Sequence, residues 1–188
     1  MIYYLNSLPS GGGEQKYIAN FDFTQSLTDS VNGFTAVLSN CTRDSSGVHL
    51  SGYTSYVSIT QLLGILTTPV FTIEVDFGDC NPVVSSDHKR LVMWTEACGF
   101  IYRSAGYWAI YNANNWYGQG NSNIDIIDNS TLKIKFHFDH KIEAYVNDTL
   151  IYSYNDIRAL TTPTSLYIGS KGFSYYDLYV KALRVYYD

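Results

Sequence analysis

Apolar and polar residues alternate along much of this chain with a period of two. The clearest segment is 131–138, TLKIKFHF, whose apolar positions are Leu132, Ile134, Phe136 and Phe138. The polar positions between them, His137 included, fall on the opposite face. Strict alternation is typical of a β-strand with one face buried and the other in water. The pattern therefore predicts a half-buried strand over these residues.

The apolar face continues beyond this strand through Ile142, Ala144 and Val146. Asp139-His140 and Asn147-Asp148 flank that second segment. Asn and Asp tolerate the backbone conformations of tight turns. We therefore expect a second strand between two short turns.

Further segments show the same period along the chain. They are 71–77, with Phe71, Ile73 and Val75 inward, and 177–188, with Leu183, Val185 and Tyr187 on one face. Only residues 61–66 indicate a helical turn. Short strands about ten residues apart, separated by polar turns, are typical of sandwiches and jelly rolls. The pattern predicts an all-β fold built as an antiparallel two-sheet β-sandwich.

The pattern divides the chain into an N-terminal arm, 1–17, and one domain, 18–188. The arm begins with apolar residues suited to anchoring, Ile2, Tyr3, Tyr4 and Leu5. Pro9 and the glycines 11–13 then predict a flexible joint. We interpret the apolar start as an anchor that binds either the domain itself or a partner chain.

Composition narrows the range of partners. Charged residues make up 15% of the 188 residues, against about 25% in an average soluble domain. Tyrosine occurs 18 times, which favours strands and places some rings at the surface. The net charge of −5 argues against nucleic acid and against anionic membrane surfaces as partners.

Membrane insertion and disulfides are also not expected. The most apolar stretch is broken by Gln61, Pro69 and Glu74, so it predicts no membrane span. The first residues lack the basic start and long apolar run of a secretory signal, so we expect synthesis in a reducing compartment. If residues 70–78 and 90–97 pair as a hairpin, the second and third cysteines are too far apart to bond. The predicted free thiols are Cys41, Cys80 and Cys98.

Six segments, in order, resemble the laminin G-like and concanavalin A-like jelly rolls. They are 21–38 (FDFTQSLTDSVNGFTAVL), 48–59 (VHLSGYTSYVSI), 71–77 (FTIEVDF), 133–153 (KIKFHFDHKIEAYVNDTLIYS), 165–170 (SLYIGS) and 177–188 (DLYVKALRVYYD). The resemblance implies the sandwich fold over 18–188 but no single function, because lectins, glycosidases and adhesion modules share it. Relatives often hold a structural calcium ion, for which Asp22 is a candidate ligand here. The resemblance implies no other cofactor.

The segment 106–123, GYWAIYNANNWYGQGNSN, combines rings and amides and carries no charge. Rings match the C–H faces of sugars, and amides match their hydroxyl edges, so this composition suits a neutral glycan. The candidate carbohydrate-binding residues are Tyr102, Tyr107, Tyr111, Asn112, Asn114, Asn115, Trp116, Tyr117 and Gln119.

A structural interpretation of the same residues stands beside this one. The alternation of 107–111 predicts that Trp108 and Ile110 belong to the core, and Trp94 has the same expected role. Trp116 and Tyr117 lie in a segment with the composition of a loop, where a ring either packs on the rim of the domain or contacts a partner. The amides can equally satisfy the loop's own backbone.

Catalysis is not expected. Residues 74–79, EVDFGD, resemble the Glu-x-Asp-x-x-Glu motif of family 16 glycoside hydrolases, with Glu74 and Asp76 on one strand face. The third position holds Asp79, which is one methylene shorter than the glutamate of the motif. His137 and His140 suggest a metal pair, but one sits on a strand and the other in a turn. We expect both to be solvated.

Two functions remain open on the sequence alone. The first is a non-catalytic, lectin-like module that binds a neutral glycan on a cell surface. It would be displayed on a bacteriophage virion after cytoplasmic assembly and held there by its arm. The second is a purely architectural protein of a virion or cell surface, without sugar binding. The alternative to a location on the virion is a secreted or cell-surface location. Homo-oligomers are compatible with either function.

Overall fold

The fold was established from a computed structural model. It describes residues 15–64, 70–81, 89–95, 98–103, 107–112, 115–121, 126, 128–137, 141–155, 166–169 and 177–187. Several predicted features lie outside these ranges, namely Ile2, Tyr3, Tyr4, Leu5, Asn114, Phe138, Asp139 and His140.

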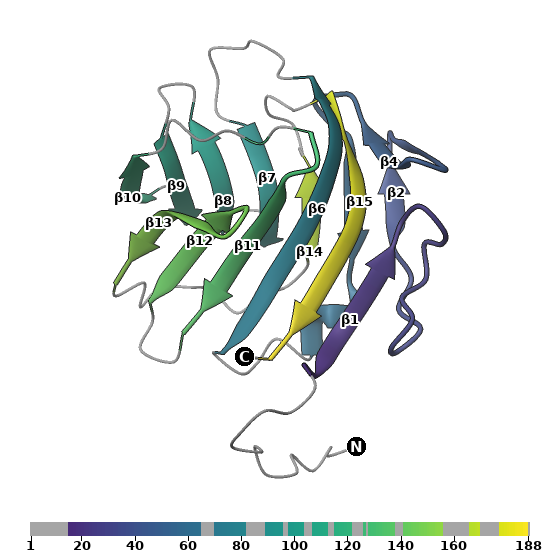
Figure 1. Cartoon of the computed structure of the whole chain (residues 1–188), viewed down its shortest axis with the longest axis horizontal. Coiled ribbons are helices and arrows are strands. Elements are labelled where there is room, and N and C mark those ends of the chain that lie inside the picture. Colours follow the sequence, from purple (N-terminus) through teal and green to yellow (C-terminus); the bar gives the residue numbers. More distant parts are fainter. Residues whose placement is uncertain are drawn as a thin grey trace.

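Two antiparallel sheets face one another and form a sandwich (Figure 1). The eight-stranded sheet has the order β13 (Thr149–Tyr154), β12 (Ile142–Val146), β11 (Thr131–Phe136), β6 (Phe71–Asn81), β15 (Asp177–Tyr186), β4 (Gly47–Leu50) and β3 (Thr42–Asp44), with β1 (Tyr17–Asp22) also paired to β15. The seven-stranded sheet has the order β10 (Asn115–Asn121), β9 (Tyr107–Asn112), β8 (Cys98–Arg103), β7 (Lys89–Thr95), β14 (Leu166–Gly169), β5 (Tyr56–Ile59) and β2 (Val37–Ser39). The predicted all-β sandwich is confirmed.

A single apolar core fills the space between the sheets. β11 and β12 alternate buried and half-buried residues along their whole length, as the sequence predicts. Rings from opposite sheets meet edge to face, Trp94 with Phe136 at 5.2 Å and Phe100 with Tyr152 at 5.6 Å between ring centroids. Trp108 is fully buried and stacks on Phe100. The predicted core positions of Trp94, Trp108 and Ile110 are confirmed.

The turn at Asn147 and Asp148 is also confirmed, with φ values of 47° and 61°. Two consecutive positive φ values match the right-handed twist of a two-residue hairpin, and Asn and Asp accept them at low cost. The helical turn expected at 61–66 is a short 3-10 helix, η1 (Gln61–Gly64). Among the described residues, no helix is long and apolar enough to cross a membrane.

Two local expectations were wrong. Residues 70–78 and 90–97 do not form a hairpin, because β6 lies in the eight-stranded sheet and β7 in the other. Trp116 and Tyr117 do not lie in a loop, because they belong to β10 and pair with β9. Asn and Gly are poor strand formers, but pairing along β9 outweighs that local preference here.

Candidate functional site

The outer face of the seven-stranded sheet carries a row of aromatic and apolar positions, which we call the ring face. Strand register places Tyr167 beside Met93, Met93 beside Gly99, Gly99 beside Tyr111, and Tyr111 beside Trp116. Residues directly opposite each other on neighbouring strands share one face of a sheet, with Cβ atoms about 4.5–5.5 Å apart. The row therefore crosses five strands, from β14 to β10.

The neighbouring row identifies which face this is. Val92, Phe100 and Ile110 are also register partners, and all three belong to the core between the sheets. Side chains alternate between faces along a strand. Met93 and Tyr111, next to members of the core row, therefore point out of the sandwich.

Gly99 shapes the middle of the ring face. A Cβ atom at this position would lie 2.3 Å from the Met93 sulfur and 2.5 Å from the Val92 carbonyl oxygen. The Met93 side chain thus occupies the space above Gly99 and is only 2% exposed. A small residue on β8 therefore makes room for Met93, which packs as a buried apolar floor between Tyr167 and Tyr111.

Rings on both sides of this floor are held in place. Arg90, which is 8% exposed, sets its guanidinium carbon 5.7 Å from the centre of the Tyr111 ring. Burial lowers the pKa of Arg90, and the electrostatic interaction with Tyr111 raises it by a smaller amount. Arginine nevertheless keeps its charge in a folded protein. On the other side, Tyr167 packs edge to face against Tyr56 with ring centroids 5.5 Å apart.

Strand register divides the predicted carbohydrate-binding residues between two faces. Tyr107, Tyr111 and Trp116 occupy positions on the ring face. The positions on the opposite face, which also carries Trp108 and Ile110, are Tyr102, Asn112, Asn115 and Tyr117. Gln119 falls in an irregularity of the β9–β10 register. A role of any of these residues in glycan binding stays a prediction.

Tyr117 has a structural role in addition. Its ring packs edge to face on Tyr154 of the other sheet, with centroids 6.0 Å apart. Its carbonyl oxygen accepts a 2.7 Å hydrogen bond from the hydroxyl of Tyr152, and burial raises the pKa of that hydroxyl. Tyr117 therefore helps to close the sandwich where β10 meets β13.

The outer face of the eight-stranded sheet, which we call the charge face, is built differently. Arg184 donates from Nε to Glu74 at 2.7 Å and from Nη2 to Asp76 at 2.6 Å. The Tyr186 hydroxyl donates to the other oxygen of Glu74, and Thr131 donates to Asp76. Although burial acts to lower it, the pKa of Arg184 is raised because both carboxylates stabilise its charge.

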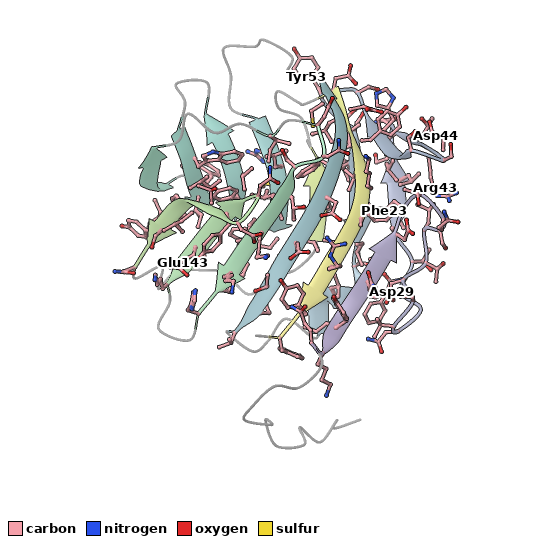
Figure 2. The ribbon with its side chains drawn as sticks, viewed as in Figure 1. Phe23, Asp29, Arg43, Asp44, Tyr53 and Glu143 are labelled. Carbon is pink, nitrogen blue, oxygen red and sulfur yellow. The ribbon has the colours of Figure 1, made fainter. Side chains whose placement is uncertain are left out.

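A second ionic group on the charge face surrounds Glu143, labelled in Figure 2. This carboxylate interacts with Lys141 at 2.5 Å and with His137 at 3.0 Å, and accepts a 3.0 Å hydrogen bond from the Tyr145 hydroxyl. Burial acts to raise the pKa of Glu143, but these three partners lower it overall. His137 lies on the polar side, as expected, and is paired with a carboxylate.

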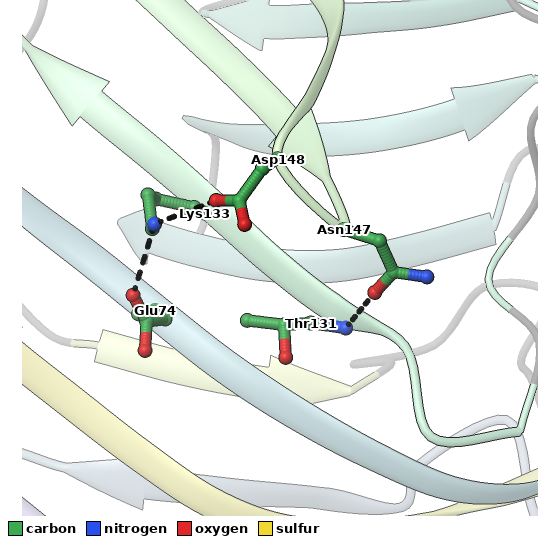
Figure 3. A pocket seen from close by; sticks show the side chains of 5 residues that line it. All are labelled: Glu74, Thr131, Lys133, Asn147 and Asp148. Atoms are coloured by element: carbon green, nitrogen blue, oxygen red, sulfur yellow. Dashed lines mark hydrogen bonds and ion pairs between the residues drawn. The ribbon is translucent and has the colours of Figure 1, made fainter.

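A hollow of about 320 Å³, the turn pocket, opens between this sheet and the β12–β13 turn (Figure 3). Its lining residues are Glu74, Thr131, Lys133, Asn147 and Asp148. Sequence reasoning missed it, because it assigned Asn147-Asp148 only a turn role and Lys133 only a solvated face. The available signal was that a turn with two polar side chains ends the strand that comes after the one with alternating lysines.

The carboxylates of the glycosidase-like motif do not resemble an isolated acid and nucleophile. Glu74 and Asp76 share one strand face, as predicted, but both bind the same guanidinium. Asp79 is exposed with a φ of 45°. Asp22 accepts hydrogen bonds from the amide and hydroxyl of Thr24, which closes the turn after β1. Across the described part of the chain, no group of three or more His, Cys, Asp or Glu is placed to hold a metal ion.

Comparisons with solved structures support the same fold. Domain 4 of the GH43 extracellular arabinanase AbnA from Geobacillus stearothermophilus, in complex with arabinotriose, matches with a TM-score of 0.68 and 14% identity, over 93% of this chain and 94% of that domain. Botulinum neurotoxin type C, which depends on interaction with two ganglioside molecules to enter cells, matches with a TM-score of 0.68 and 12% identity. Trypanosoma rangeli sialidase matches with a TM-score of 0.67 and 13% identity.

The extent of these matches differs. The match to the neurotoxin covers 91% of this chain but only 47% of the neurotoxin chain. The match to the sialidase covers 90% of this chain but only 30% of the sialidase chain. No protein-family model matches the chain, and no curated protein is similar to it in sequence. The structural neighbours are thus β-sandwich domains from carbohydrate-binding and glycosidase proteins, and the likeness shows the fold.

Proposed function

We propose that this chain is a non-catalytic glycan-binding module and that the ring face is its binding surface. The observation that carries the proposal is the register pairing of Tyr111 with Trp116 beside the apolar floor of Met93. Two aromatic positions on adjacent strands offer a flat platform about one sugar ring wide. Two structural neighbours, one solved with arabinotriose and one that depends on gangliosides for cell entry, support the proposal of glycan binding.

The ring face has the chemistry that a mostly neutral glycan requires. Aromatic faces stack on the C–H faces of sugars, and a few polar groups fix their orientation. The Arg90 guanidinium beside Tyr111 is buried, so it supports the ring from within the protein. The proposal does not include hydrolysis, and the binding of both Glu74 and Asp76 by Arg184 supports this choice.

The biological setting in the proposal is a bacteriophage virion. The module is assembled in the cytoplasm, anchored by its N-terminal arm through Ile2, Tyr3, Tyr4 and Leu5, and exposed to a glycan on the host surface. The domain then recognises the cell while the arm binds another structural protein. The low charge and the tyrosine content are compatible with a surface that contacts sugars.

The test is a glycan array with the purified chain and three variants. Tyr111→Ala and Trp116→Ala each remove a ring from the proposed platform, and Tyr53→Ala removes a ring that is 59% exposed in a turn elsewhere. We expect the first two to weaken binding by at least about tenfold, which is about 1.4 kcal/mol, while the third binds normally. Unchanged circular dichroism must accompany the loss. If neither the wild type nor any variant binds a glycan on the array, the result would favour the architectural function.

A further inference from the structure

The turn pocket lies on the opposite sheet from the ring face and has a different chemistry. Its floor consists of the outer faces of β6 and β11, and its wall is the Asn147-Asp148 turn (Figure 3). A volume of about 320 Å³ is at the small end of the range for ligand pockets, about 300–1,000 Å³. The pocket therefore has room for one small unit.

The side chains of the wall are fixed by bonds to the floor. The Asn147 side-chain oxygen accepts a 2.9 Å hydrogen bond from the Thr131 amide, and Figure 3 shows its nitrogen on the far side of that bond. Asp148 reaches back to Lys133 at 3.1 Å through one carboxylate oxygen. The bond to Thr131 thus fixes the orientation of the Asn147 amide, whose nitrogen points away from Glu74 and Lys133 in Figure 3, and Asp148 presents its second oxygen as an acceptor.

The floor adds a matching pair of groups. Lys133 lies 3.5 Å from Glu74, and these two carboxylates take two of the three donors of its ammonium. The pKa of Lys133 is raised: burial acts to lower it, but Asp148 and Glu74 outweigh that effect. The Thr131 hydroxyl donates to Asp76 and keeps lone pairs that can accept. The pocket therefore brings the Lys133 ammonium together with oxygen acceptors of Glu74, Asp148 and Thr131.

This arrangement selects against most ligand classes. A phosphate or carboxylate would meet Glu74 and Asp148, and an amine would meet Lys133. An apolar group would find no apolar residue among the five described residues of the lining. A hydroxyl group both donates and accepts, so neighbouring hydroxyls can bond to an ammonium, an amide and a carboxylate oxygen together.

We propose that the turn pocket is a second binding site, which takes one neutral, hydroxyl-rich unit such as a terminal sugar residue. It is separate from the ring face, because different atoms on a different sheet carry it. No aromatic side chain is among the described residues that line the pocket, so hydrogen bonds rather than stacking would hold the ligand. The module would then contact glycan through both outer faces.

The test is nuclear magnetic resonance of the full ¹⁵N-labelled chain, titrated separately with arabinotriose, maltotriose and cellotriose. We expect the amides of Thr131, Asn147 and Asp148 to shift with at least one of these sugars. Asn147→Asp keeps the oxygen that binds the Thr131 amide but removes the N–H donors. It should weaken the sugar response at the turn pocket at least tenfold, whereas Lys135→Met, on the same strand face, should not.

Each outcome distinguishes the two sites. Shifts confined to Tyr111 and Trp116 would overturn the turn pocket and leave the ring face supported. Shifts confined to the turn pocket would support it and count against the ring face. No shift at the turn pocket with any of the three sugars, or an unchanged response in Asn147→Asp, overturns the inference.

Discussion

The two outer faces of this sandwich use their side chains in opposite ways. On the charge face, Arg184 binds Glu74 at 2.7 Å and Asp76 at 2.6 Å, so these ionic groups already have partners within the fold. On the ring face, Arg90 lies against the Tyr111 ring, and Met93 forms an apolar floor. A face whose charges neutralise each other stabilises the sheet, whereas a platform of rings offers area that a ligand can cover.

The difference also separates stability from recognition. Removing a member of an ionic group leaves its partners unpaired within the protein, so the fold loses free energy. Removing an exposed ring takes away contact area that a ligand would use and alters the fold less. Substitutions on the two faces should therefore differ in both the size and the kind of their effect.

The largest expected loss of stability comes from Arg184→Met. It leaves Glu74 and Asp76 without their shared guanidinium, and their side chains are only 15% and 27% exposed. We expect unfolding free energy to fall by about 3 kcal/mol, the lower end for breaking a buried pair. Urea denaturation measures this, with Lys16→Met, at an exposed position before β1, as the control. A loss no greater than that of the control would show that the charge face does not stabilise the sheet.

Gly99→Ala should have the next largest effect and tests the packing of the ring face. The added Cβ would lie 2.5 Å from the Val92 carbonyl oxygen and 2.9 Å from the Met93 Cα, and backbone atoms cannot move aside freely. Overpacking of this kind costs about 2 kcal/mol. At Gly52 the nearest atom is the tip of the Ser55 side chain at 3.1 Å, so Gly52→Ala is a mild control in the same denaturation assay. Equal stability of the two variants would contradict a tight floor at Met93.

Tyr111→Leu should lower stability less but affect binding more. It removes the ring under Arg90 while keeping an apolar side chain, and a cation–π contact at such a site contributes about 1 kcal/mol. Tyr111→Phe keeps the ring and should lose less than Tyr111→Leu in both denaturation and the glycan array. If the two variants behave alike, the ring has neither role.

Much of the eight-stranded sheet could be predicted from the sequence, because its signals are local. The strands β11 and β12 alternate strictly, and the turn between β12 and β13 consists of Asn147 and Asp148. Each of these features depends on neighbouring residues, so periodicity and turn chemistry are sufficient to identify them. The same local consistency made the buried positions of Ile134 and Ala144 predictable.

The ring face could be predicted only in part, because it depends on pairing between strands. The sequence identified Tyr111 and Trp116 as candidates, but it could not show that β10 is a strand that pairs them on one face. A shift of one residue in register would place these rings on opposite faces. The turn pocket was missed for the same reason, since Lys133 and Asp148 come together only through the β11–β12 pairing.

The smallest expected effect concerns pH and the group around Glu143. Its pKa is lowered in the folded chain because Lys141, Tyr145 and His137 outweigh the effect of burial, and Lys135 stands opposite in register. A carboxylate with a lowered pKa adds stability above its unfolded pKa, and that stability is lost as the pH falls through the folded value. We expect the wild type to lose about 0.5 kcal/mol more than Glu143→Gln between about pH 5 and pH 3.

Urea denaturation at a series of pH values measures this difference. Tyr111→Leu provides the comparison from the other face, because it replaces neither a carboxyl nor a histidine side chain. Its curve should run parallel to that of the wild type, whereas the curve of Glu143→Gln should converge with it in acid. If the curve of Glu143→Gln also runs parallel, the carboxylate does not stabilise the charge face. The distinction between an ionic face and a ring face would then rest on Arg184 alone.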